Sequence, residues 1–289
     1  MPETQTLPLA GGRSTGFVQW GDPGGQPVIH LHGTPGSRLE RYVDEAVTAS
    51  LGIRFITLDR PGYGAAEPVP GWTLLDCASV VAGLADHLGL DRFKLHAMSG
   101  GAPYALATAW ALGDRVAAAA IVAGLGPLDR PGALDGMSEE NVAEYAIARA
   151  EPERLGRFLS RRRTAPAMPE AELATLSRIP GLLDMLIENH GEMTRQGQAG
   201  TVSDHLAVVA PWGFRLQDVA VPLHLWHGDR DTLVPIHHAE HVAATVPRAV
   251  LHRRRGEGHF DMFARQRDVL GLLADQPWAG RGPDGRSPR

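Results

Sequence analysis

Short apolar runs alternate with longer amphipathic stretches along most of this chain. The apolar runs are bounded by Gly, Pro or Asp and have the length of buried strands. They are residues 53–59, 93–97, 116–124, 221–228 and 249–254. Apolar side chains at helical spacing predict helices over 72–90, 236–245 and 260–273. Because strands that alternate with helices build a parallel sheet covered on both faces, we predict a mostly parallel, doubly wound α/β fold.

One long stretch breaks this alternation. Residues 127–214 contain no run typical of a strand, and their apolar side chains fall at helical spacing instead. We therefore predict an α/β core made of residues 1–126 and 215–275, with residues 127–214 inserted as a helical lid, or cap, over one edge of the sheet. The last residues, 276–289, are rich in Gly, Pro and charge and are predicted to be a disordered tail.

Two local patterns support helices inside this insertion. Ser138 followed by Glu139 and Glu140 is typical of a helix start, because serine caps the first turn and acids complement the helix dipole. Farther along, one apolar stripe is predicted to be buried, against other helices of the lid or over the opening above Ser99. Its members are Leu182, Leu183, Leu186 and Ile187.

A single serine stands where the strand 93–97 passes into a helix. Ser99 has Ala97 two positions before it and Gly101 two positions after it, which fits the G-x-S-x-G nucleophile elbow with Ala in place of the first Gly. A sharp strand-to-helix turn exposes the hydroxyl but needs small neighbours. The alternative is that Ser99 is only an N-cap, a position that serine favours.

A serine nucleophile also needs hydrogen-bond donors for the developing oxyanion. The stretch "HGTPGSR" (32–38) follows a predicted strand, and the Thr34 N–H is available there, whereas Pro35 has none. The Gly100 N–H, immediately after the serine, is the second predicted donor.

An acid and a base must complete such a site. Asp231 in "HGDRDTLVP" (227–235) is the preferred acid, with Asp229 as the second choice. His259 in "GEGHF" (256–260) lies on a glycine-flanked loop before the last helix and is the predicted base. The chain order Ser, Asp, His is that of α/β-hydrolases.

Together, these motifs and "LDRPGYG" (58–64) resemble the α/β-hydrolase fold superfamily, in its lidded serine hydrolase branch. The resemblance implies the triad Ser99, Asp231 and His259, the oxyanion donors Thr34 and Gly100, and no cofactor. It implies cleavage of a carboxylic ester or a related acyl bond through an acyl-enzyme. A carbon–carbon bond hydrolase or a lactonase could use the same triad, and a non-catalytic ligand-binding protein could keep the fold. A serine at the elbow argues against epoxide hydrolase and dehalogenase chemistry.

The substrate is expected to be a small molecule with an apolar portion. Apolar residues beside the serine and on the lid are the candidates to line its pocket, namely Met98, Leu186 and Trp212. No G-x-G-x-x-G follows the first strand, so a dinucleotide cofactor is not expected. The stretch "HHAEH" matches the metal motif H-x-x-E-H through His237, Glu240 and His241, but it falls on an outer helix, and we predict no metal site.

Composition limits the partners and the compartment. The chain has 289 residues and a formal net charge of −5, which gives no electrostatic case for binding nucleic acid. Cys77 is its one cysteine, which fits a reducing compartment. The N-terminus carries no signal-peptide pattern, and the longest apolar run is far too short to span a bilayer. We expect a cytoplasmic protein with no membrane insertion, and the sequence leaves its oligomeric state open.

Overall fold

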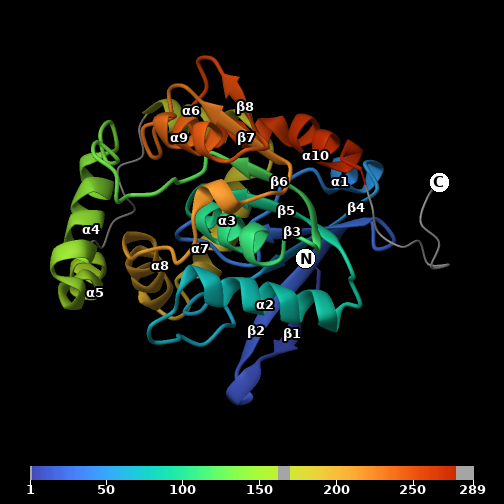
Figure 1. Cartoon of the computed structure of the whole chain (residues 1–289), viewed down its shortest axis with the longest axis horizontal. Coiled ribbons are helices and arrows are strands. Elements are labelled where there is room, and N and C mark those ends of the chain that lie inside the picture. Colours follow the sequence, from blue (N-terminus) through green and yellow to red (C-terminus); the bar gives the residue numbers. More distant parts are fainter. Residues whose placement is uncertain (1, 162–169, 278–289) are drawn as a thin grey trace.

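A computed structural model describes residues 2–161 and 170–277 of the chain. Its centre is an eight-stranded sheet in the order β1-β2-β4-β3-β5-β6-β7-β8 (Figure 1). The strands are β1 (Gln5–Pro8), β2 (Ser14–Gly21), β3 (Gln26–Leu31), β4 (Ile53–Leu58), β5 (Phe93–Met98), β6 (Val116–Val122), β7 (Leu223–Gly228) and β8 (Ala249–Arg254). From β4 to β8 all neighbours are parallel, whereas β2 runs antiparallel to both β1 and β4. The predicted mostly parallel α/β fold is confirmed.

Helices cover both faces of this sheet (Figure 1). The core helices are α1 (Glu45–Ser50), α2 (Leu74–His87), α3 (Ala102–Ala111), α9 (His237–Thr245) and α10 (Gln266–Asp275). Buried side chains of α2, α3 and α9 form one cluster with the sheet, and those of α10 form a second cluster on the other face, beside α1. The two central strands β5 and β6 are buried along their whole length, as expected for strands covered on both sides.

The stretch between β6 and β7 is helical in its described residues. It contains α4 (Glu139–Ala150), α5 (Pro152–Arg161), α6 (Glu170–Arg178), α7 (Leu182–Met193) and α8 (Ala199–Val209). In Figure 1, α8 lies between the pair α4 and α5 and the rest of the molecule. Ser138 caps α4 as predicted, because its side chain accepts a hydrogen bond from Asn141 N–H. We call this stretch the helical segment 127–214.

The sequence pattern missed some features and misjudged one. The edge strand β1 was not predicted. In α7, Leu183 and Ile187 are exposed by 48% and 62% instead of being buried, because the buried face runs through Leu182 and Met185. Residues 278–289 of the predicted tail lie outside the described part of the chain.

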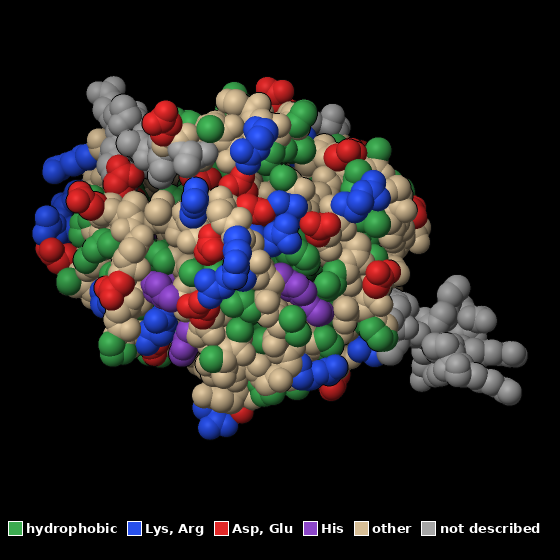
Figure 2. All heavy atoms as spheres, turned by 90° about the horizontal axis from the view of Figure 1, so that it is seen from above, with side chains coloured by type: hydrophobic (Ala, Val, Ile, Leu, Met, Phe, Trp, Pro, Cys, Tyr) green, Lys and Arg blue, Asp and Glu red, His purple; other side chains and the backbone are tan. Residues whose placement is uncertain are grey.

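Charges of both signs are mixed on the face seen in Figure 2. Acidic and basic side chains are interleaved on the face seen in Figure 2 rather than gathered into a patch of one sign. Among the described residues, no helix is both long and apolar enough to cross a membrane.

Candidate functional site

Ser99 sits in a sharp turn at the carboxyl end of β5. Its φ is 52°, a left-handed value that non-glycine residues rarely adopt, and a 3-10 turn (Ser99–Gly101) leads from it directly into α3. The turn is tightly packed, because a Cβ on Gly101 would collide with the carbonyl oxygens of Leu31 and His32. The Ser99 hydroxyl caps neither helical turn and makes no hydrogen bond among the described residues. The N-cap alternative therefore does not account for this serine.

Asp231 and His259 are in direct contact. Asp231 follows β7, and its Oδ2 accepts a hydrogen bond of 2.7 Å from His259 Nδ1. Its Oδ1 accepts from the N–H groups of Leu233 (2.9 Å) and Val234 (2.8 Å), which fixes the carboxylate. The Nε2 of His227 lies 3.4 Å from Oδ2 as well. Because a carboxylate only accepts, Nδ1 of His259 carries the proton and Nε2 is left as the acceptor.

The electrostatics of this pair favour an ionised acid and a basic imidazole. Burial is the largest single influence and lowers the pKa of His259, but the charge and hydrogen bond of Asp231, together with nearby acids, outweigh it, so the net pKa is raised. The charges of Glu172 and Glu40 act in the same direction as Asp231. Burial raises the pKa of Asp231, yet His259 and His227 together hold it well below its usual range.

The two predicted oxyanion donors lie against each other. A Cβ placed on Gly100 would lie 3.1 Å from the Thr34 nitrogen and 2.6 Å from Thr34 Cβ, so Gly100 is in close contact with Thr34. A larger residue at position 100 would push the loop after β3 away. Gly33 is also close to the elbow, because its own Cβ position lies 3.5 Å from Ser99 Cβ.

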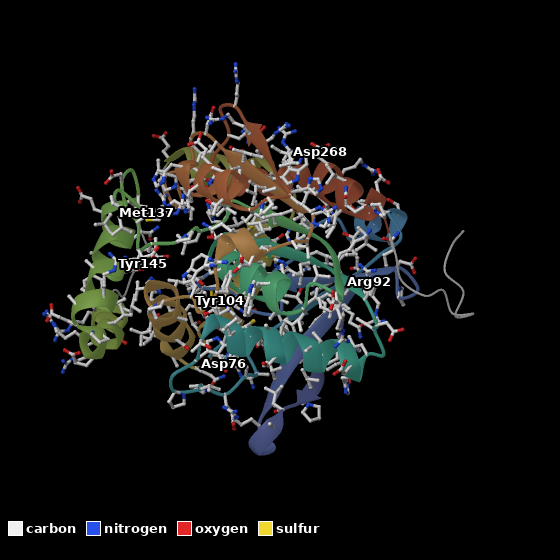
Figure 3. All side chains as sticks on the ribbon, viewed as in Figure 1. Asp76, Arg92, Tyr104, Met137, Tyr145 and Asp268 are labelled. Atoms are coloured by element: carbon white, nitrogen blue, oxygen red, sulfur yellow. The ribbon has the colours of Figure 1, made fainter. Side chains whose placement is uncertain are left out.

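A buried aspartate of the helical segment holds this loop. Asp204 on α8 accepts a 2.6 Å hydrogen bond from the Thr34 hydroxyl. It also accepts from the Arg60 guanidinium and from the hydroxyls of Tyr63 (3.0 Å) and Tyr104 (2.7 Å). Figure 3 shows Tyr104 where α3 faces α8. Burial lowers the pKa of Arg60, but Asp204 and the two tyrosines together raise it above its ordinary value, so the guanidinium stays charged.

A second acid of the helical segment holds the histidine loop. Glu172 on α6 is buried, and its carboxylate accepts hydrogen bonds from the N–H groups of His259 (2.7 Å) and Phe260 (3.0 Å). Thr175, one turn farther along α6, donates a 2.9 Å hydrogen bond to Asp261 on the same loop.

The loop that carries Asp231 is also bonded to the helical segment. Ser138 N–H donates to the carbonyl of Thr232 (3.0 Å), and the Asn141 side chain donates to the carbonyl of Leu233 (3.0 Å). The helical segment therefore contacts all three loops that carry the predicted site residues.

The three predicted pocket residues do not lie together. Met98 is buried in one apolar cluster, and Leu186 packs against that same cluster. Trp212 packs against the other cluster, and its ring lies 5.8 Å from Phe214, which in turn stacks on Trp110 near the far end of α3.

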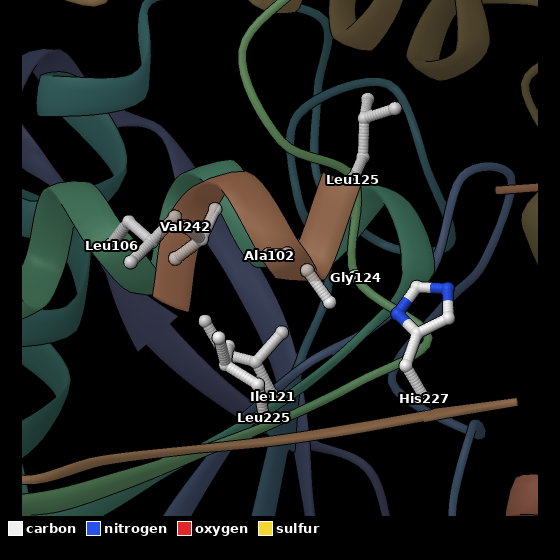
Figure 4. A pocket seen from close by; sticks show the side chains of 9 residues that line it. Ala102, Leu106, Ile121, Gly124, Leu125, Leu225, His227 and Val242 are labelled. Carbon is white, nitrogen blue, oxygen red and sulfur yellow. The ribbon is translucent and has the colours of Figure 1, made fainter. Parts of the chain in front are cut away.

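The cavity in Figure 4 lies among α3, β6, β7 and α9. Its volume of about 10 Å³ is close to the space that one water molecule needs, so it is too small for a substrate. His227 contributes the ring in its wall, with a buried Nδ1 that has no hydrogen bond among the described residues.

The remaining sequence candidates are engaged elsewhere. Asp229 accepts a 2.7 Å hydrogen bond from Gly256 N–H and is exposed. On α9, His237 contacts Arg130, and Glu240 is paired with an arginine of β8. Within residues 2–161 and 170–277, no group of three or more His, Cys, Asp or Glu side chains could hold a metal ion.

Comparison with known proteins decides the family. The sequence model of the alpha/beta hydrolase fold matches residues 26–265. This chain belongs to the α/β-hydrolase fold family. Proline iminopeptidase from Xanthomonas citri is 34% identical to this α/β-hydrolase over 100 residues, which are 32% of this chain and 30% of that protein. The match thus spans about a third of the curated relative.

Solved structures resemble this α/β-hydrolase over nearly its whole length. An alpha/beta hydrolase fold protein from Nakamurella multipartita has a TM-score of 0.69 at 23% identity and covers 94% of this chain and 99% of its own. The enol-lactonase from Burkholderia xenovorans LB400 has a TM-score of 0.69 at 18% identity, covering 94% and 98%. At these identities the likeness shows the fold alone.

Proposed function

We propose that this α/β-hydrolase is a serine hydrolase that cleaves a carboxylic ester or a related acyl bond. The observation that carries the proposal is the 2.7 Å hydrogen bond between Asp231 and His259, in a chain whose Ser99 is half-buried in a strained turn between β5 and α3. The relation of acid to base is that of a catalytic triad, in which the acid orients the imidazole.

In the proposed reaction, Ser99 Oγ attacks the carbonyl carbon, and His259 Nε2 takes the hydroxyl proton. The resulting imidazolium is stabilised by Asp231 and then protonates the leaving alcohol. The negative oxygen of the tetrahedral intermediate accepts hydrogen bonds from the N–H groups of Thr34 and Gly100. Water, deprotonated by His259, attacks the acyl-enzyme, and Ser99 regains its proton as the acid leaves. No hydrogen bond joins Ser99 to His259 among the described residues. Catalytic hydrogen bonds are often long without substrate and shorten only in the enzyme–substrate complex, so this is compatible with the proposed steps.

We further propose that the helical segment 127–214 is a lid over this site. Its bonds to the loops of Thr34, Asp231 and His259 support that role. A cover that excludes water strengthens the electrostatic interactions beneath it. The apolar cluster of Met98 and Leu186 supports a substrate with an apolar portion.

The test is pre-steady-state hydrolysis of 4-nitrophenyl esters with acyl chains of increasing length, with lactones measured in parallel. We expect a burst of nitrophenol equal to the enzyme concentration, because the acyl-enzyme accumulates. Ser99→Ala should lose roughly 10³-fold or more in turnover. Its stability should change little, because the hydroxyl has no partner to lose. If esters are not turned over but lactones are hydrolysed rapidly, the proposed substrate class would change from an ester to a lactone. No turnover of either class would contradict the proposal.

A further inference from the structure

A buried chain of hydrogen bonds leads to the loop that carries Thr34. The Tyr42 hydroxyl is 3.3 Å from His96 Nε2, the Nδ1 atoms of His96 and His30 are 2.8 Å apart, and His30 Nε2 is 3.1 Å from Glu40 Oε1. The four side chains come from β3, β5 and the loop after β3, and all are buried. The chain ends at Glu40 Oε1, which also accepts a 2.8 Å hydrogen bond from Gly33 N–H.

The proton positions along this chain are constrained. A carboxylate only accepts hydrogen bonds, so His30 donates to Glu40 from Nε2. The two facing Nδ1 atoms of His30 and His96 share one proton. Burial lowers the pKa of His96 well below its ordinary value and raises that of Tyr42, so His96 is a neutral ring and Tyr42 keeps its proton. The chain therefore fixes the position of Glu40 Oε1, and with it the backbone at Gly33.

The second oxygen of Glu40 faces the elbow. The Cβ position on Gly33 lies 3.3 Å from Glu40 Oε2 and 3.5 Å from Ser99 Cβ, so the carboxylate and the serine flank the same glycine. Oε2 makes no hydrogen bond among the described residues, and only 6% of Glu40 is exposed. A buried negative charge thus stands next to the proposed nucleophile.

The cations nearby are engaged by other acids. Arg41, the neighbour of Glu40, binds Glu188 at 3.1 Å and lies over the Trp20 ring. On the loop of His259, Asp261 is paired with Arg178. The charges that raise the pKa of the His259 ring are those of carboxylates.

Two carboxylates are bonded to His259: Asp231 binds Nδ1 of the ring, and Glu172 accepts from the backbone N–H. The charge of Glu40, on the loop after β3, acts in the same direction and also raises the pKa of the ring. Glu40 is the one of these that also touches the oxyanion loop, through Gly33.

We propose that Glu40 is a positioning residue of this site. Its Oε1 holds Gly33, and so the backbone that carries the Thr34 N–H, and its carboxylate flanks the same glycine as Ser99. The inference rests on the proposed function, because it needs Ser99 as nucleophile and His259 as base. A fixed charge in a poorly solvated site acts far more strongly than it would in water.

The test measures how fast a fluorophosphonate labels Ser99, by intact mass, as a function of pH. This probe needs no knowledge of the natural substrate. Labelling requires a neutral His259, so its rate rises with pH through the pKa of that ring. Glu40→Gln keeps an oxygen for Gly33 N–H and loses the charge. We expect the midpoint of the rise to fall by about half a pH unit or more.

Two further variants separate charge from anchoring. Glu40→Leu loses both the negative charge and the acceptor for Gly33 N–H. Its labelling rate at the high-pH plateau should fall at least about tenfold, because misplaced oxyanion donors stabilise the transition state less. Asp184→Asn removes an exposed acid of α7 and should leave the midpoint in place. If Glu40→Leu does not fold, the midpoint of the labelling profile of Glu40→Gln still tests the inference.

An unchanged midpoint in Glu40→Gln, or an equal shift in Asp184→Asn, overturns the inference while leaving the proposed function intact. Failure of the wild-type protein to be labelled at Ser99 overturns both. The two failures are therefore distinguishable in one experiment.

Discussion

Asp204 on α8 accepts a 2.6 Å hydrogen bond from the Thr34 hydroxyl across 170 positions of sequence. The same carboxylate is the partner of Arg60, whose side chain is only 1% exposed. A buried ion pair thus connects the helical segment 127–214 to the loop proposed to bind the oxyanion. Such a pair adds little net stability when complete, but removing one partner leaves the other charge buried without a counter-charge.

The first prediction concerns stability. Asp204→Asn should lower the free energy of unfolding by about 3–5 kcal/mol, because Arg60 is left buried without its counter-charge. Asp184→Asn, on the exposed side of α7, should stay within about 0.5 kcal/mol of wild type. Urea unfolding of the three proteins provides the comparison. Equal stability of all three would mean that the ion pair does not anchor the helical segment.

The second prediction separates the two aspartates after β7. Asp231→Asn should cost about 10⁴-fold in turnover, the effect of a wrong imidazole tautomer in a well-studied triad. Asp229→Asn should change turnover little, because Asp229 is bonded to the Gly256 backbone and not to His259. Steady-state ester hydrolysis at the pH optimum measures both. A larger loss in Asp229→Asn would move the acid role to that residue.

The third prediction is the pH dependence of kcat/KM. The proposed base His259 must be neutral to accept a proton, so activity should rise with pH through its pKa in the free enzyme. Because Asp231, Glu172 and Glu40 together raise that pKa above the ordinary 6.5, the midpoint should lie above 6.5. Glu172→Gln removes one of these negative charges and should lower the midpoint. A wild-type midpoint below 6.5 would show that burial, not the carboxylates, dominates at this ring.

The fourth prediction concerns specificity. Leu186→Ala should weaken the preference for longer acyl chains by about 1–3 kcal/mol, the range available to apolar discrimination. Ile187→Ala is the matched control on the same helix, because Ile187 is 62% exposed and points away from the cluster. The ratio of kcat/KM for long and short esters measures the effect. An identical profile for both variants would place specificity on the sheet loops.

The sequence predicted the elements that depend on local pattern. Strand and helix alternation, the cap of α4 and the turn at Ser99 are set by neighbours a few positions apart. The pairing of Asp231 with His259 could be anticipated as well, since both follow strands of the same sheet and their motifs come in a known order.

The contacts that hold the site could not be predicted in this way. Glu172 meets His259 across 87 positions, and Asp204 meets Thr34 across 170. An acidic residue in a helical sequence pattern is expected to be solvated, because acids are rarely buried without a partner. Only the tertiary fold shows the donor against which it is buried. The face of α7 was misjudged for the same reason, because packing, not spacing alone, decides which apolar residue is covered.

The central claim is that Ser99 is an activated nucleophile. Its most direct test is incubation of the native protein with a fluorophosphonate, followed by intact mass and peptide mapping. We expect one adduct per chain, located on the peptide that contains Ser99. Labelling should be abolished in Ser99→Ala and slowed strongly in Asp231→Asn. A native protein that remains unlabelled, or an adduct on another residue, would contradict it.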